Sequence, residues 1–160
     1  MSVICNLKGE QKEYFLQELF NKEEKIEFSI ESNIESLDID KISLLYKYGV
    51  NRISLGVQSF NNDTLVELNR KHTKEMIFEV VGKIKNVGIK NISIDYIYGI
   101  NDSLEEIKKD MNTFLKLDIP HISCYSLIIE DNTVFGINNR KYIDEDIEYS
   151  MYKYISNFLS

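Results

Sequence analysis

Polar side chains stand inside, or directly after, apolar runs that are typical of buried strands. Glu31 ends the run KIEFSIE, Gln58 follows RISLGV, and Asp95 lies within NISIDYIY. A fourth run, HISCYSLII, carries the pair Tyr125 and Ser126. A buried carboxylate is costly unless it is paired or hydrogen-bonded, so Asp95 indicates a side chain that faces a ligand. Carboxylates accept hydrogen bonds and an amide both donates and accepts, so this set is able to bind a polar molecule.

The same residues also have structural interpretations, which the sequence leaves open. Glu31 could cap the loop that follows it, through Asn33 or Ser36. Gln58 could hydrogen-bond to loop backbone, as buried amides usually do. Arg70, in ELNRKH, is by itself typical of a solvated arginine at the end of a helix. Only the carboxylate within NISIDYIY is hard to explain without a ligand.

Cysteine and histidine spacing argues against a metal site. Cys5 and Cys124 lie far apart in the chain and form no C-x2-C doublet. His72 and His121 are isolated from each other and have no H-x-x-x-H spacing. The sequence therefore predicts two free, buried thiols in a reducing compartment and no protein-ligated metal.

Length and composition limit the possible classes of protein. A chain of 160 residues is sufficient for one domain. Its 43% hydrophobic and 28% charged residues are ordinary for a soluble globular protein. A formal net charge of -7 disfavours nucleic acid or an anionic membrane as a partner. No run approaches the length of about 18 apolar residues that a membrane span needs, and the first residues lack the features of a signal peptide. We therefore expect a cytoplasmic protein.

Hydrophobic periodicity predicts helices and strands that alternate along the chain. The expected strands are 25–31, 52–57, 91–98 and 121–129. The expected helices are 9–20, 38–50, 61–68, 73–89, 103–117 and 144–160, with an extended loop at 131–132 and 136–140. Helix starts are indicated by Asp38 and Thr73 as N-caps and by Ser103 with Glu106 as a capping box, and Gly88 is expected to close the helix before it.

Four strands joined by helical segments predict parallel pairing with right-handed crossovers. No G-x-G-x-x-G follows any strand, which argues against a dinucleotide-binding sheet. The predicted fold is therefore α/β, a partial (β/α) barrel with about four parallel strands. In that architecture the carboxyl ends of all strands meet on one rim. We expect Glu31, Gln58, Asp95 and the pair Tyr125 and Ser126 to come together there.

Five segments strengthen this interpretation: EFSIESN, GVNRISLGVQSFN, LNRKH, GIKNISIDYIYGI and HISCYSLIIEDNT. In this order and at these intervals they resemble the radical S-adenosylmethionine proteins related to oxygen-independent coproporphyrinogen III oxidase and to a haem chaperone close to it. The resemblance implies a partial barrel that binds S-adenosylmethionine and a 4Fe-4S cluster on its rim and acts in porphyrin or haem metabolism. It also implies cofactor contacts at Glu31, Gln58, Arg70 and Asp95.

The chain also departs from this family. The family's cluster needs three closely spaced cysteines after the first strand, because thiolates hold three of its irons, and no such triplet is present. The family's glycine-rich stretch and its carboxy-terminal domain are missing too. We therefore expect residues 1–160 to be a single truncated half-barrel domain that contains neither catalytic residues nor metal ligands.

Three functions are compatible with these observations. The chain could be a segment of a radical S-adenosylmethionine oxidoreductase, without turnover of its own and dependent on a complementing chain for the cluster. It could be a non-catalytic module that binds S-adenosylmethionine or haem, with His72 or His121 as the axial ligand. It could also be a nonfunctional remnant, since an opened barrel exposes the edge of its first strand.

Overall fold

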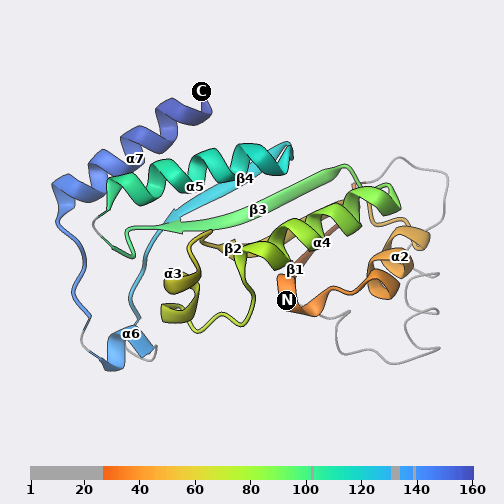
Figure 1. The fold of residues 1–160 in the computed structure, drawn as a ribbon, viewed down its shortest axis with the longest axis horizontal. Coiled ribbons are helices and arrows are strands. Elements are labelled where there is room, and N and C mark those ends of the chain that lie inside the picture. The colour runs from red at the N-terminus through yellow and green to blue at the C-terminus, as the bar shows by residue number, and fades with distance from the viewer. Residues whose placement is uncertain (1–26, 102, 131–133, 139) are drawn as a thin grey trace.

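The computed structural model describes residues 27–101, 103–130, 134–138 and 140–160. Its strands are β1 (Ser29–Asn33), β2 (Arg52–Gln58), β3 (Asn91–Tyr98) and β4 (His121–Ser126). Its helices are the short 3-10 helix η2 (Ile34–Ser36), α2 (Ile39–Lys47), α3 (Asn62–Glu67), α4 (Lys74–Val87), α5 (Leu104–Leu117), α6 (Val134–Ile137) and α7 (Glu145–Leu159) (Figure 1). The expected helix 9–20 lies outside the described residues.

The strands form one parallel sheet in the order β1-β2-β3-β4, and helices connect each strand to the next. The predicted α/β fold of about four parallel strands is therefore confirmed. An Ile-Ser pair occurs in each of β2, β3 and β4, at 53–54, 92–93 and 122–123. The pairs of β2 and β3 match in register, because Ile53 pairs with Ile92 and Ser54 with Ser93. In β4 the register is shifted, because Ile122 pairs with Ile94.

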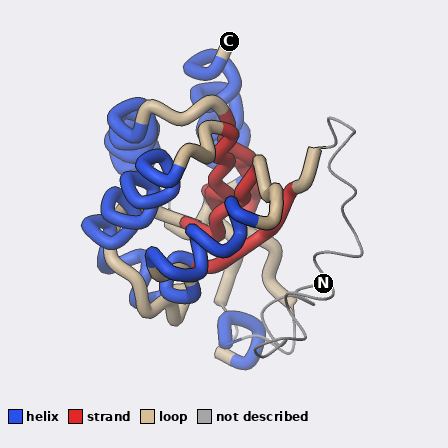
Figure 2. The backbone as a smooth tube through the Cα atoms, turned by 90° about the vertical axis from the view of Figure 1, so that its right-hand side faces the viewer, coloured by secondary structure: helices blue, strands red, loops and turns tan. Residues whose placement is uncertain are grey.

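One face of the sheet packs against helices, which lie mainly on one side of it (Figure 2). Isoleucine, leucine and valine from alternate positions of β2 and β3 meet apolar residues of α2, α4, α5 and α7 there. The central members of this core are Ile53, Leu55, Ile92, Ile94, Ile42, Ile77, Ile84, Met111 and Met151, all fully buried. This packing fixes which side chains of each strand point to the opposite face, because neighbouring residues in a strand alternate between faces.

The helix ends follow most of the expected capping. Asp38 accepts from the Lys41 amide at 2.8 Å and Thr73 from the Met76 amide at 3.5 Å. Gly88 ends α4 at φ 114°, a backbone conformation that glycine adopts without strain. The capping box is only half formed. Ser103 accepts from the amide of Glu106, but the Glu106 carboxylate accepts from Thr64 Oγ1 instead of closing the box.

Three expected boundaries are wrong. The first strand begins at Ser29 and continues to Asn33, and the fourth ends at Ser126 rather than at 129. Gly136 and Ile137, expected in the loop, belong to the short helix α6. In the part of the chain that the structure describes, no helix has the length and apolar character needed to span a bilayer.

Candidate functional site

The sheet surface opposite the core consists of two rows of side chains, here called the polar face. Register partners in a parallel sheet point to the same side. The first row is Glu31, Ser54, Ser93 and His121, and the second is Asn33, Gly56, Asp95 and Ser123. None of the eight belongs to the core cluster, and all except Gly56 carry a polar side chain. The polar face is the candidate site.

Gln58 reaches the polar face from the end of β2. The backbone is irregular at this point. The register between β2 and β3 shifts between Gly56 and Gln58, and Gln58 adopts φ 70°. A Cβ built on Gly56 would lie 3.0 Å from Gln58 Nε2 and 3.2 Å from Asn33 Oδ1. The two amide groups therefore meet over Gly56, in space that only glycine leaves free.

Glu31 and Asp95 make the polar face electrostatically negative. Ser54 Oγ, between them in the sheet, donates to Asp95 Oδ1 at 3.4 Å. Burial and the nearby charge of Glu31 raise the pKa of Asp95, and the Ser54 hydrogen bond offsets only part of this. No salt bridge within the described residues joins either carboxylate to a basic side chain. The carboxylates thus remain available to a cation.

Arg70 is the predicted site residue that lies outside the strands of the polar face. It follows α3, where its amide donates to Leu65 O at 2.8 Å. Its charge acts on Glu35, just beyond β1. Partial burial raises the pKa of Glu35, but hydrogen bonds and the charges of His72 and Arg70 outweigh it and lower that pKa below its usual value. Glu31 and Asp95 also lie within their strands rather than at the expected rim.

The pair Tyr125 and Ser126 is divided between the two faces of β4. Tyr125 is 55% exposed and pairs with Ile97 of β3. Ser126 Oγ instead donates to the Glu148 carboxylate of α7. Only the tyrosine is therefore free to face a ligand.

Sequence reasoning missed the serines and Asn33 on the polar face. Ser54, Ser93 and Ser123 are small polar residues within apolar runs, where they attract no attention singly. The signal is their spacing. Asn33 stands two positions after Glu31, and Asp95 two after Ser93, which is the period of one strand face. Counting by twos from each carboxylate would have found Asn33 and Ser93, whereas Ser54 and Ser123 join the rows through the register between strands.

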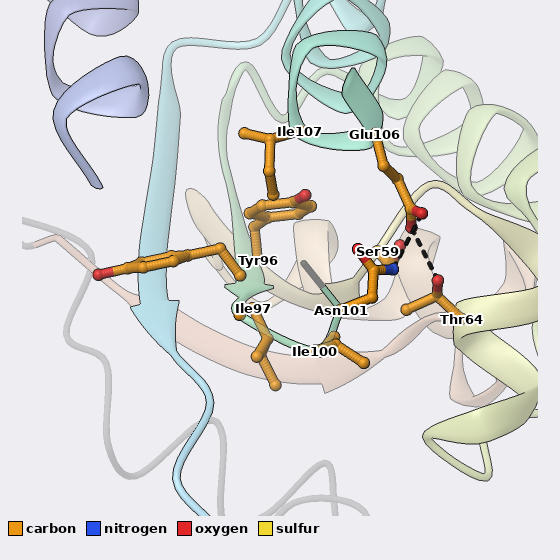
Figure 3. Close-up of a pocket in the computed structure, with 10 residues that line it drawn as sticks. Ser59, Thr64, Tyr96, Ile97, Ile100, Asn101, Glu106 and Ile107 are labelled. Atoms are coloured by element: carbon orange, nitrogen blue, oxygen red, sulfur yellow. Dashed lines mark hydrogen bonds between the residues drawn. The ribbon is translucent and has the colours of Figure 1, made fainter. Parts of the chain in front are cut away.

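A small cavity lies near the carboxyl ends of β2 and β3 on the helical side (Figure 3). Its volume is about 10 Å³, which holds at most about one water molecule. The Glu106 carboxylate accepts from Thr64 Oγ1 at 2.8 Å and from Asn101 Nδ2 at 2.9 Å, so these groups are already paired (Figure 3). This cavity cannot accommodate a cofactor.

The histidines and Cys124 offer little to a metal. His72 is buried, and its ring nitrogens face Glu35 Oε2 at 3.2 Å and Val57 O at 3.0 Å, so it is not free to ligate haem. His121 is exposed at the start of β4. Burial raises the pKa of the Cys124 thiol to about 11, which disfavours the thiolate. The described residues contain no group of three or more His, Cys, Asp or Glu side chains able to hold a metal ion. Cys5 lies outside them.

Comparisons with known proteins agree with this arrangement. The family model of the radical SAM superfamily matches residues 6–114. The chain is 41% identical over 139 residues to the heme chaperone HemW of Lactococcus lactis, which covers 84% of this chain and 37% of the relative. It is 39% identical over 110 residues to HemW of Bacillus subtilis, covering 68% of this chain and 29% of the relative.

Among solved structures, coproporphyrinogen III oxidase (HemN) from Escherichia coli, described as a radical SAM enzyme, matches with a TM-score of 0.82. Sequence identity is 23%, and the match covers 96% of this chain and 37% of HemN. Archaeal Elp3 from Methanocaldococcus infernus matches with a TM-score of 0.73 over 81% of this chain and 32% of Elp3, at 23% identity. At these identities the structural matches establish the fold, and the chain spans well under half the length of the proteins it matches.

Proposed function

Because the chain belongs to the radical SAM superfamily, we propose that its polar face binds S-adenosylmethionine (SAM) within a protein of haem or porphyrin metabolism. The observation that carries this proposal is the pair of carboxylates, Glu31 and Asp95. They lie together beside the Gln58 amide, and neither forms a salt bridge with a basic side chain in the part of the chain that the structure describes. The haem chaperones and the coproporphyrinogen oxidase that the chain resembles support the metabolic context.

The residues present fit this cofactor. SAM carries a positive sulfonium and a positive ammonium group, and a cation close to a carboxylate stabilises its ionised form. Burial and, after it, the charge of Glu31 raise the pKa of Asp95, and a bound cation would offset the effect of that charge. Carboxylate oxygens can accept hydrogen bonds from ribose hydroxyls or the ammonium group, and the Gln58 amide can donate or accept. Arg70 follows α3 and lies outside the strands of the polar face, and its guanidinium would pair with the cofactor's carboxylate from there.

The residues do not fit a 4Fe-4S cluster. Such a cluster is held by cysteine thiolates, and this sequence has two cysteines, far apart. We propose that any cluster ligands come from outside this chain, in a complementing polypeptide. The chain alone would then bind SAM without turnover, as one half-barrel domain of residues 1–160 located in the cytoplasm.

The positive sulfonium of SAM allows a direct test of the role of the two carboxylates. S-adenosylhomocysteine has the same adenosine and amino acid groups as SAM but a neutral sulfur. Isothermal titration of the chain with each ligand should show tighter binding of SAM. Asp95→Asn and Glu31→Gln should each reduce that preference, by about tenfold if one charge contact of about 1.4 kcal/mol is lost.

Asp40→Asn is the matched control, because Asp40 is an exposed acid on α2 away from the polar face. It removes the same charge and should leave the preference unchanged. Equal affinity for the two ligands would refute a role of the carboxylates in recognising the sulfonium charge. No binding of SAM by the unmodified chain would refute the proposal and favour a nonfunctional remnant.

Haem binding is a second candidate function, favoured by the exposed imidazole of His121 at the end of the first row. A haem titration followed by visible absorption tests it, with His121→Ala expected to abolish the axial-ligand spectrum. His72→Ala would be uninformative about ligation, because both ring nitrogens of His72 already have partners.

A further inference from the structure

The segment from Val57 to Asn61 is held in an unusual conformation at the end of β2. Gln58 has φ 70°, and the amide of Ser59 donates to Val57 O at 2.9 Å. A hydrogen bond between residues two apart, around a central residue with positive φ, defines the strained form of the γ-turn. Such backbone persists only when its surroundings over-determine it, and it gathers at ligand-binding sites.

His72 supports this turn from one side. Its Nε2 lies 3.0 Å from Val57 O, the carbonyl that already accepts from Ser59, and must donate because a carbonyl oxygen only accepts. Its Nδ1 faces Glu35 Oε2 at 3.2 Å, so the ring orientation is set at both ends. His72 is 2% exposed.

Asp110 of α5 supports the turn from the other side. Its Oδ2 accepts from Ser59 Oγ at 3.2 Å, from the Phe60 amide at 3.3 Å and from Tyr96 OH at 3.0 Å. The residue is 4% exposed. Two of these donors belong to the residues directly after Gln58, so the backbone is bonded both before and after the strained position.

We propose that His72 and Asp110 are positioning residues that keep the γ-turn closed and thereby hold the Gln58 amide over Gly56 on the polar face. Gln58 is the last residue of β2, and the register shift after Gly56 pairs it with Tyr96, whose side chain belongs to the core. The turn nevertheless directs the Gln58 side chain to the polar face, with Nε2 3.0 Å from the position of a Cβ on Gly56. The relevance to SAM rests on the proposed function, whereas the geometry of the turn does not.

Nuclear magnetic resonance of the labelled chain, without ligand, tests the geometry. Asp110→Ala should shift the Gln58 side-chain amide signals and raise its HN–Hα coupling toward that of an extended residue. Asp110→Asn should restore both, because an amide oxygen can still accept. The control is Thr113→Ala, which truncates another buried side chain of α5 whose hydroxyl bonds only within the helix, to Lys109 O. It should leave Gln58 unchanged.

Two histidine variants separate the two contacts of His72. His72→Gln places an amide where Nε2 stands and should preserve the Gln58 signals, whereas His72→Asn reaches toward Glu35 and should not. In the unmodified chain, the amides of Ser59 and Phe60 should exchange slowly with solvent, a measurement that needs no variant to fold. Unchanged Gln58 signals in folded Asp110→Ala and His72→Asn, or rapid exchange of both amides, would overturn the proposal.

A SAM titration of the same variants then addresses the role. Affinity should fall by about threefold to tenfold in Asp110→Ala and His72→Asn, the effect of one lost hydrogen bond, and recover in Asp110→Asn and His72→Gln. If Gln58 moves in the variants but the unmodified chain binds no SAM, the positioning role stands and the proposed function fails. If SAM binds and Gln58 moves without any loss of affinity, Gln58 is not a cofactor contact and the positioning has no role in binding.

Discussion

Single residues distinguish the polar face, the candidate site, from an ordinary sheet surface. Most solvent-facing carboxylates are paired or fully hydrated, but Asp95 is half-buried beside Glu31. Gly56 leaves space that the amides of Gln58 and Asn33 occupy. The charge of Asp95 lowers stability, and Gly56 reduces packing, without improving the core. The binding of a polar cation to the polar face would account for both features. Each can be tested by itself.

We expect Asp95→Asn to stabilise the chain at neutral pH while weakening SAM binding. Burial and Glu31 raise the folded-state pKa of Asp95 above its unfolded value, so the protonated form favours folding. The ionised form therefore lowers stability, and this loss develops as pH rises from the unfolded pKa through the folded pKa. The gain in the variant should be below about 1 kcal/mol, because solvent screens partly exposed charges.

Urea unfolding at several pH values measures this difference. The advantage of Asp95→Asn should shrink as pH falls through that interval, where the native carboxyl takes up its proton. Asp40→Asn, at an exposed position on α2, should show no such pH dependence. If Asp95→Asn instead makes the chain less stable at neutral pH, the native carboxylate makes a stabilising contact.

We expect Gly56→Ala to weaken SAM binding with little effect on folding. The new methyl group would lie 3.0 Å from Gln58 Nε2, the flexible end of a side chain, which can move aside. Unfolding free energy should change by less than about 1 kcal/mol, because alanine also restricts the unfolded chain. Calorimetry in a Gln58→Ala background provides the control. Gly56→Ala should have a smaller effect on affinity there, and an equal effect would mean that it acts through another group.

At the scale of elements, local sequence signals predicted where helices begin better than where strands end. Asp38, Thr73 and Ser103 cap α2, α4 and α5 as expected, because a capping oxygen bonds to an amide within the next turn. Strand limits depend on which partner is available. Ser32 and Asn33 are typical of a loop by residue type, yet they pair with Leu55 and Gly56 of β2.

The candidate site was predicted in part, for the same reason. Glu31, Gln58 and Asp95 were found from their types, and the structure brings them together on one face. The positions of Glu31 and Asp95 depend on strand alternation and register. The γ-turn that directs Gln58 to the polar face depends on His72 and Asp110, which are 14 and 52 residues away in the chain (72 − 58 and 110 − 58). Arg70 was selected through resemblance alone, and no contact in the described residues connects it to the other three.

Gly88→Ala tests an element boundary that sequence did identify. Gly88 ends α4 at φ 114°, and a Cβ there would lie 3.2 Å from the ring of Tyr46 on α2. Alanine is strained at positive φ, so the unfolding free energy should fall by more than about 1 kcal/mol. Gly82→Ala is the matched control, because nothing lies within 4 Å of a Cβ at that position within the same helix. It should raise stability by about 0.5–1 kcal/mol, measured by urea unfolding. Similar effects of both changes would contradict this account of the helix end.

At the scale of the whole molecule, the proposed cofactor surface lies in an open sheet, and the two cysteines of the sequence are too few for the thiolate set that holds a 4Fe-4S cluster. Among the described strands, β1 pairs only with β2 and β4 only with β3, so both outer strands present backbone groups for further pairing. The chain also spans 37% of the length of the Lactococcus lactis relative. A complementing polypeptide that extended the sheet would place its own residues next to the polar face.

We expect anaerobic treatment of the purified 160-residue chain with iron and sulfide to leave it colourless and free of iron. A cluster needs several neighbouring thiolates, and the pKa of Cys124 is raised to about 11 by burial, so this thiol would have to ionise against its surroundings. Iron analysis and the visible spectrum measure the outcome, with Cys124→Ser expected to give the same result. About two irons per chain, lost in Cys124→Ser, would instead show that two copies with two cysteines each share one 4Fe-4S cluster, and the need for a complementing polypeptide would disappear.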